Sequence, residues 1–190
     1  MLTDTHCHLT SSKFDADRAE VIARAIEAGV TRMVTICTQL ENEPQVRAIA
    51  DAHAPVFYAA GVHPMSVAEH APFTLDDLLT IADHPKMVGI GETGLDYHYT
   101  ADSKAIQIES LRLHIEAARQ TNLPLIIHSR DADDDMADIL SAEFRAAPYT
   151  CVMHCFSSGS DLAATALGRV FSSGTPAFTA FFTAARRCWL

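Results

Sequence analysis

About six short apolar segments, each followed by a longer amphipathic segment, fill residues 1 to about 167 and constrain the fold more than any other feature. The apolar segments, such as "RMVTIC" and "LPLIIHSR", are rich in Val, Ile and Met, which is typical of strands buried on both faces. The amphipathic segments, such as "DADRAEVIARAIEAGV", space apolar residues at helical intervals, with Asp15 or Asp17 as a candidate N-cap and Gly29 as a candidate left-handed end. Repeated units of this kind predict a parallel sheet covered by helices.

Such a sheet can be doubly wound or can close into an eight-stranded barrel, and the placement of reactive residues favours the barrel. In a (β/α)8 barrel the carboxyl ends of the strands converge on one mouth, where residues distant in sequence meet. The candidates at or just after predicted strand ends are His6, His8, His63, Glu92, His128 and His154. A closed barrel typically needs about 250 residues, whereas this chain has 190. We therefore predict an α/β fold of the (β/α)8 TIM-barrel type in an incomplete form, with a barrel domain over 1–167 and an atypical tail over 168–190.

The charge balance limits the partners of the chain. Its 24 acidic and 14 basic side chains give a net charge of -10, which argues against a broad positive surface for nucleic acid. To bind a nucleic-acid substrate, such a chain would need local positive charge, for instance from metal ions. The start "MLTDTHCHLT" lacks the pattern of a signal peptide, and no apolar stretch reaches about 18 residues, so we expect a cytoplasmic protein without a membrane partner. The cysteines are odd in number and dispersed, which favours reduced thiols.

The first candidate site is the pair of histidines in "DTHCHL". Alternate residues of a strand point to the same face, so His6 and His8 would project together while Cys7 points the other way. Two imidazoles on one face can bind a Zn, Mn or Fe ion, and a carboxylate ligand would shift the preference toward harder ions. The alternative is a pair of ordinary polar or capping histidines.

Three further polar residues follow apolar strands, where burial is expensive unless a partner is present. Glu92 lies in "GIGETGLDY", His128 in "LIIHSR" and His154 in "VMHCFS". Taken singly, each has a structural alternative: Glu92 could cap a loop, and the histidines could bond to backbone. Together with His6 and His8 they are more simply explained as one metal-binding site.

These segments resemble a known family. "DTHCHL", "GVHP", "GIGETGLDY", "LPLIIHSRDADDD" and "HCFSSG" are similar, in order and spacing, to motifs of the TatD-type metal-dependent deoxyribonucleases, a branch of the amidohydrolase-like TIM barrels. The resemblance implies a binuclear site in which His6 and His8 hold one ion. His128 and His154 would hold the second ion, and the Glu92 carboxylate would bridge the two.

The resemblance also implies a reaction, the hydrolysis of phosphodiester bonds in DNA, with His63 and Glu92 as catalytic residues. One or two divalent ions, Mg, Mn or Zn, would be the cofactors. Two ions about 3.5 to 4 Å apart can acidify a water and clamp phosphate oxygens. Arg130 is a candidate phosphate ligand, with a salt bridge to the "DADDD" run as its alternative. Tyr97 is a candidate for substrate binding at the mouth, with a turn role as its alternative.

The end of the chain departs from the family pattern. Family members carry an aspartate in a later motif resembling "ETDAPYL", but no Asp or Glu follows Asp161 here. One hypothesis is a changed reading frame near residue 167. We expect at least one ion to be retained, the other to be held more weakly, and hydrolysis to be reduced or lost. The alternatives are a non-catalytic metal-binding remnant and a related hydrolase that cleaves an ester or amide bond. Open edges of the first and last strands also predict self-association, unless the tail or a partner covers them.

Overall fold

The computed structural model describes residues 2–168 and contains one sheet of six strands in the order β1-β2-β3-β4-β5-β6. All neighbouring strands are parallel. A sequential order is the winding of a barrel, because the order of a doubly wound sheet reverses. The predicted incomplete barrel is therefore confirmed. The strands are β1 (Leu2–Cys7), β2 (Val30–Cys37), β3 (Val56–Ala60), β4 (Met87–Asp96), β5 (Leu125–Arg130) and β6 (Cys151–Met153).

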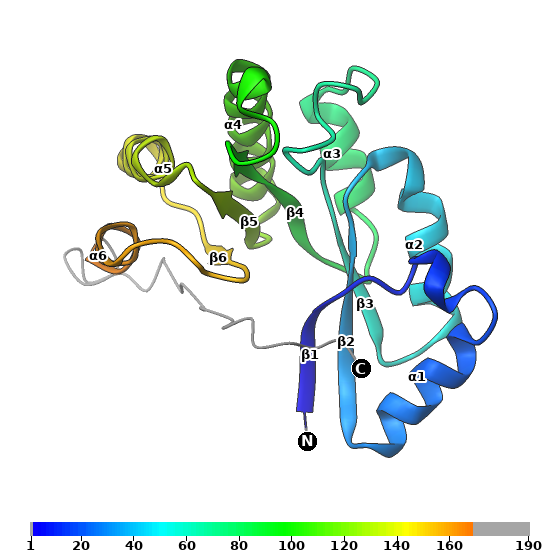
Figure 1. The fold of residues 1–190 in the computed structure, drawn as a ribbon. Coiled ribbons are helices and arrows are strands. Elements are labelled where there is room, and N and C mark those ends of the chain that lie inside the picture. The colour runs from blue at the N-terminus through cyan, green and yellow to red at the C-terminus, as the bar shows by residue number, and fades with distance from the viewer. Residues whose placement is uncertain (1, 169–190) are drawn as a thin grey trace.

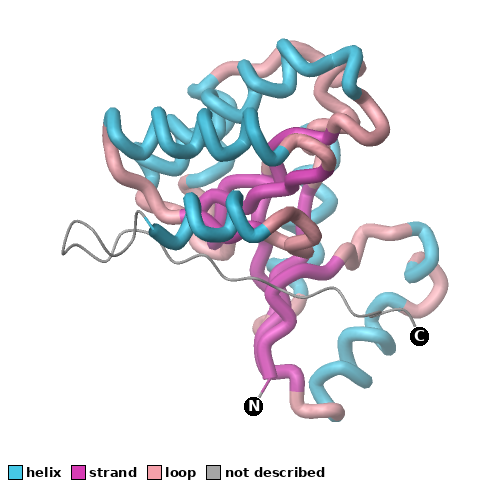
Figure 2. Tube along the Cα trace, turned by 60° about the vertical axis from the view of Figure 1, so that its left-hand side comes forward, coloured by secondary structure: helices cyan, strands magenta, loops and turns pink. Residues whose placement is uncertain are grey.

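The helices lie around the outside of the curled sheet (Figure 1). Figure 2 shows the same arrangement from another side, with the strands together in the middle of the molecule. The α-helices are α1 (Arg18–Glu27), α2 (Glu43–Ala52), α3 (Leu75–Ala82), α4 (Lys104–Thr121), α5 (Asp133–Ala146) and α6 (Ser160–Gly168). Three short 3-10 helices, η1 (Ser12–Phe14), η2 (Leu40–Asn42) and η3 (Ala101–Ser103), lie in the connections before α1, α2 and α4. None of the described helices is both long and apolar enough to cross a membrane.

Local sequence explains several helix boundaries. α3 begins with a capping box, in which Thr74 and Asp77 exchange side-chain to backbone hydrogen bonds. α1 begins after Asp17, as predicted, although the Asp17 side chain makes no capping hydrogen bond. Gly29 follows α1 with φ +92°, the left-handed conformation predicted for it. α4 ends at Asn122, which has φ 57°.

The main core lies between the outer face of the sheet and the helices. Ile90 and Ile127 on the strands, and Leu111 and Ile115 on α4, belong to one hydrophobic cluster and are fully buried. Burying each such side chain contributes about 1.5–3 kcal/mol. This core fixes the strands, and with them the side chains at their carboxyl ends.

The inner face of the sheet is hollow and mainly apolar. Every strand contributes to its lining, β1 and β4 with two residues each, and His154 after β6 completes it: Thr5, His6, Val34, Ala59, Val88, Gly89, Ile126 and Val152 are the strand residues. Within residues 2–168, β1 pairs only with β2 and β6 only with β5. The edges expected to be open are therefore present in the described part of the chain, while self-association stays a prediction. Apart from Gly168, the predicted tail 168–190 lies outside the described residues.

β4 differs from its predicted form. Glu92 was expected at or after a strand end, but β4 continues through it to Asp96. The register with β5 is irregular between Ile90 and Thr93, which lets the strand continue past the glycines. Gly94 has φ +144°, and a β-carbon there would overlap the carbonyl oxygen of His128, so the close approach of β4 and β5 requires glycine at this position.

Candidate metal centre

Six predicted site residues meet at the carboxyl ends of the strands and form what we call the mouth cluster: His6, His8, His63, Glu92, His128 and His154. Glu92 is at its centre and only 2% exposed. Its Oε2 lies 3.3 Å from His6 Nε2. Its Oε1 lies 2.9 Å from His154 Nε2, 3.3 Å from His128 Nδ1 and 3.5 Å from His63 Nε2. β1, β5 and the connections after β3 and β6 thus direct histidine side chains toward one carboxylate on β4.

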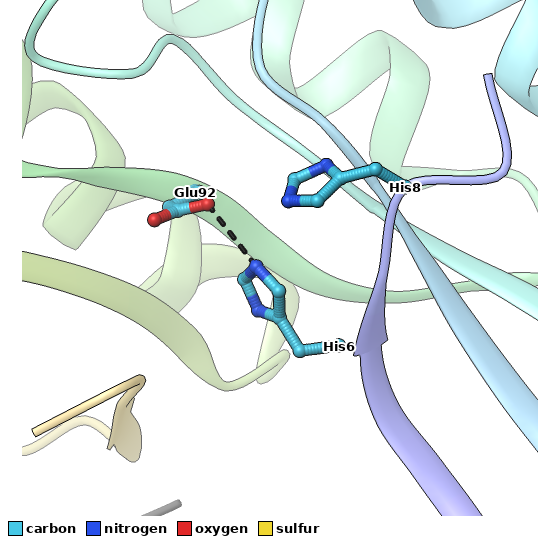
Figure 3. Close-up of side chains that lie close together, drawn as sticks. All are labelled: His6, His8 and Glu92. Carbon is cyan, nitrogen blue, oxygen red and sulfur yellow. Dashed lines mark ion pairs between the residues drawn. The ribbon is translucent and has the colours of Figure 1, made fainter. Parts of the chain in front are cut away.

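One part of the mouth cluster comes from β1 and the residue after it. His6 and His8 point from the same side of the chain toward Glu92 (Figure 3). Each of these three residues offers a ligand atom within 4.8 Å of the others. Burial and the neighbouring His6 lower the pKa of His8, which favours a neutral ring with a lone pair available to a metal. Cys7 packs against the core instead, and its thiol donates to the Val34 carbonyl.

A second group of three also shares the carboxylate. His63, Glu92 and His128 each offer a ligand atom within 4.8 Å of the others. His154 belongs to neither group of three, but its ring stacks on His6 with the centroids 3.8 Å apart. The resemblance paired His128 with His154, whereas the group of three within 4.8 Å joins His63 to Glu92 and His128. His154 nevertheless lies nearer to Glu92 Oε1 than His63 does, at 2.9 Å against 3.5 Å.

Asp96 orients His128. The carboxylate of Asp96 is fully buried, and its Oδ2 lies 3.0 Å from His128 Nε2. With the proton on Nε2, the lone pair of Nδ1 faces Glu92, which is the arrangement of a metal-bound histidine held by a second carboxylate. The sequence motifs predicted no contact between Asp96 and a metal ligand. The even spacing of Asp96 from Glu92 along one strand was the signal that could have identified it.

His63 presents a different ring nitrogen to Glu92 than His128 does, and its tautomer follows from a backbone contact. Its Nδ1 accepts a hydrogen bond of 3.2 Å from the Met65 backbone N–H. A neutral His63 therefore carries its proton on Nε2, the atom that faces Glu92. This ring is prepared to donate a proton into the mouth.

The electrostatics of the mouth cluster centre on an ionised Glu92. Burial alone would raise the pKa of Glu92, but the imidazoles of His128, His154, His6 and His63 around its carboxylate hold that pKa well below its ordinary value. Burial alone would lower the pKa of His128, but the carboxylates of Glu92 and Asp96 raise it.

His6 provides the test of whether a metal fits. Both of its ring nitrogens are buried without a hydrogen-bond partner, because the 3.3 Å approach to Glu92 lacks hydrogen-bond geometry. Buried nitrogens are normally satisfied, and a missing ligand is one explanation for those that are not. Imidazoles around a carboxylate are a donor set that suits Zn and Mn. The residues therefore fit a divalent metal.

The two predicted substrate-binding residues lie beside the mouth cluster. The Tyr97 hydroxyl donates to Asp135 Oδ2 at 2.7 Å, so it is already engaged. Arg130 is exposed, and its guanidinium carbon lies 4.7 Å from the Tyr99 ring centroid. Within the described residues Arg130 makes no ion pair, so the salt bridge considered for it is not seen. The "DDD" run lies in the first turn of α5, as expected for acids that complement a helix dipole.

The chain is similar in sequence to known metal-dependent hydrolases and nucleases. The family described as TatD related DNase matches residues 3–187. An uncharacterized metal-dependent hydrolase of Bacillus subtilis, YabD, is 36% identical over 163 residues, which cover 86% of this chain and 64% of YabD. The 3'-5' ssDNA/RNA exonuclease TatD of Salmonella typhimurium is 31% identical over 153 residues, 80% of this chain and 58% of that protein.

A solved structure shows the same architecture. YjjV, a TatD homolog from Escherichia coli K12, superposes with a TM-score of 0.77 at 30% identity, over 86% of this chain and 63% of YjjV. The chain thus spans less than two thirds of the length of YabD and YjjV.

Proposed function

Because the chain belongs to the TatD-related DNase family, we propose that it is a metal-dependent hydrolase that cleaves phosphodiester bonds in DNA. Residues 1–167 would form the hydrolase unit, in the cytoplasm. The observation that carries the proposal is the sharing of one buried carboxylate, Glu92, by two groups of potential metal ligands. The name of the Salmonella typhimurium relative supports nucleic acid as the substrate class.

The proposed metal ligands are those that the family resemblance implies. We assign His6, His8 and Glu92 to one ion, and Glu92, His128 and His154 to a second. When bound, divalent cations such as Mg, Mn or Zn supply a water of lowered pKa and positive charge at the phosphate oxygens. Positive charge at the mouth would also allow a chain of net charge -10 to accept an anionic substrate.

The other residues orient groups and hold protons. Asp96 keeps the His128 proton on Nε2, which leaves Nδ1 free for the site. His63, with its proton on Nε2, can donate that proton to the oxygen that leaves phosphorus. Arg130 can contact a phosphate at the rim of the mouth.

The family's additional aspartate is missing from the sequence pattern. We therefore retain the expectation that one ion is held more weakly and that hydrolysis is slower than in a complete site. Weak binding of one ion would appear as a rate that rises with metal concentration beyond the point at which the first ion is bound.

The test is cleavage of a labelled single-stranded DNA oligonucleotide with Mg or Mn. Product is expected from the parent chain and is expected to be lost in Glu92→Ala and His128→Ala. His53→Ala is the matched control, because His53 lies just before β3, at the opposite end of that strand from the mouth. No product from the parent, with metal still bound, would support a non-catalytic remnant. Cleavage of an ester or amide but not of DNA would support a related hydrolase.

A further inference from the structure

An exposed aromatic side chain with a cation on its ring lies beside the mouth cluster. Tyr99 is 58% exposed, although large aromatic rings such as Tyr58 are buried elsewhere in the described chain. The guanidinium of Arg130 lies over the Tyr99 ring, 4.7 Å from its centroid. His98 meets the same ring edge-on at 4.5 Å. Tyr99, Arg130 and His98 form a small exposed surface that no contact of the mouth cluster uses.

The surface is tied to the mouth cluster by one carboxylate. Asp96 Oδ1 accepts a hydrogen bond of 2.8 Å from the Tyr99 backbone N–H. Its other oxygen, Oδ2, lies 3.0 Å from His128 Nε2, and His128 Nδ1 lies 3.3 Å from Glu92. A chain of three contacts therefore fixes the position of Tyr99 relative to the centre of the site.

Arg130 is held from the β5 side. It pairs with Asp96 in the register of β4 and β5, and its carbonyl oxygen accepts a hydrogen bond from the Tyr97 backbone N–H at 3.0 Å. His98 Nδ1 lies 2.8 Å from Asp131 Oδ2, which joins the connection after β4 to the connection after β5. Both the β4 side and the β5 side of this surface are thus anchored.

The charge of Arg130 is available to a ligand. Across residues 2–168 its guanidinium forms no ion pair, and three of the four acids that follow it at positions 131–135 have other partners. Asp131 contacts His98, Asp133 accepts a hydrogen bond from a backbone N–H, and Asp135 pairs with a lysine. A cation that rests on an exposed aromatic ring presents positive charge next to a flat apolar face.

We propose that Tyr99 and Arg130 form a recognition site for an unpaired nucleobase and its phosphate. The inference rests on the proposed function and names residues that would select the substrate at the same mouth. An aromatic ring can stack on any base, and in single strands the faces of the bases are accessible. Tyr99 stacks on a base next to the bond that is cleaved, while Arg130 contacts the adjoining phosphate.

Binding of two fluorescent single-stranded oligonucleotides with phosphorothioate linkages that resist cleavage, measured by anisotropy with Mn²⁺ at low salt, tests the proposal without cleavage. One oligonucleotide carries its bases and the other is abasic with the same phosphates. The parent chain is expected to bind the first about tenfold more tightly than the second. Tyr99→Ala is expected to remove that difference, and Tyr99→Phe to keep it. Ile26→Ala is the matched control, because Ile26 is 45% exposed and lies near the end of α1, away from the mouth.

Equal affinity of the parent for the two oligonucleotides, no binding of either, or an unchanged difference in Tyr99→Ala would overturn the proposal. Loss of affinity for both oligonucleotides to the same extent in Tyr99→Ala would also overturn it, since that outcome indicates structural damage. The result is independent of catalysis. A base preference without cleavage in the metal assay would reject the proposed hydrolysis and keep the recognition site, and cleavage without a base preference would do the reverse.

Discussion

The mouth cluster and helix α4 both contain a histidine whose ring nitrogens are buried, but only the histidine on α4 has hydrogen-bond partners for them. His114 on α4 is completely buried, and each ring nitrogen has a backbone partner: Nδ1 contacts the Ser110 carbonyl at 2.7 Å and Nε2 accepts from the Val62 N–H at 3.1 Å. In the mouth cluster, both ring nitrogens of His6 lack a hydrogen-bond partner, and Glu92 is contacted by four imidazoles at once.

The difference separates a structural role from a binding role. A buried polar group whose partners are all present holds elements together, and a group whose partners are incomplete points to a ligand. His114 ties α4 to the backbone just before His63. The fully hydrogen-bonded histidine on α4 thus helps to position a histidine of the mouth cluster. Substitutions in the two regions should therefore affect different properties, activity in the mouth cluster and stability on α4.

The largest effect is expected for Glu92→Gln. Removing the charge that the histidines and the metal share should lower the rate of DNA cleavage by about 1,000-fold, or about 4 kcal/mol in activation free energy. The far-UV circular dichroism should stay that of a folded chain. Steady-state cleavage of a labelled oligonucleotide measures the change.

Glu43→Gln is the matched control for this variant. Glu43 is 3% exposed, similar to Glu92, but it contacts the Tyr58 hydroxyl at 2.8 Å, outside the mouth cluster. Its rate should stay close to that of the parent. Equal losses of rate in the two variants would mean that burial of a glutamate, and not the mouth cluster, determines the result.

The next effect is a dependence of stability on pH that comes from His114. Burial lowers the pKa of His114 from 6.5 to about 4. Between these values the unfolded chain binds a proton that the folded chain does not, so stability is complete above pH 6.5 and falls as the pH drops toward 4. The loss approaches about 3 kcal/mol. Urea unfolding at several pH values, for the parent and His114→Gln, measures it.

His114→Gln removes the titrating group, so the free energy of unfolding of this variant should fall less over that pH range. The carboxylates that titrate over the same range are common to both proteins and cancel in the difference. Parallel pH curves for the two proteins would show that His114 is not responsible.

A smaller effect is expected for Gln107→Ala on α4. The Gln107 side chain accepts from the Asp96 N–H at 2.8 Å and donates to the Thr100 carbonyl at 2.8 Å and to Ser103 Oγ at 2.8 Å. Its loss leaves buried backbone groups without partners and should lower the free energy of unfolding by about 1–3 kcal/mol. Gln120→Ala on the same helix removes only an exposed contact, so its free energy of unfolding should change by less than about 0.5 kcal/mol. A similar loss in both variants would argue against this role.

Periodicity and motifs predicted most of the fold and the centre of the site, because both depend on patterns local in sequence. The apolar segments became the six strands, and the histidines and Glu92 came together. Residues whose roles depend on contacts between elements distant in sequence were not predicted. Asp96 meets His128 across 32 positions of sequence, and His114 reads in sequence as one more residue of a helix. The continuation of β4 past Glu92 was missed because glycines usually indicate a loop.

Metal binding by the purified chain tests the central claim most directly, because every proposed role of the mouth cluster requires it. Calorimetric titration of the metal-free parent with Mn²⁺ should show saturable binding of at least one ion per chain. Binding should be lost or strongly weakened in Glu92→Gln and retained in Glu43→Gln. An absence of saturable binding in the parent, or the same isotherm in Glu92→Gln, would contradict the account.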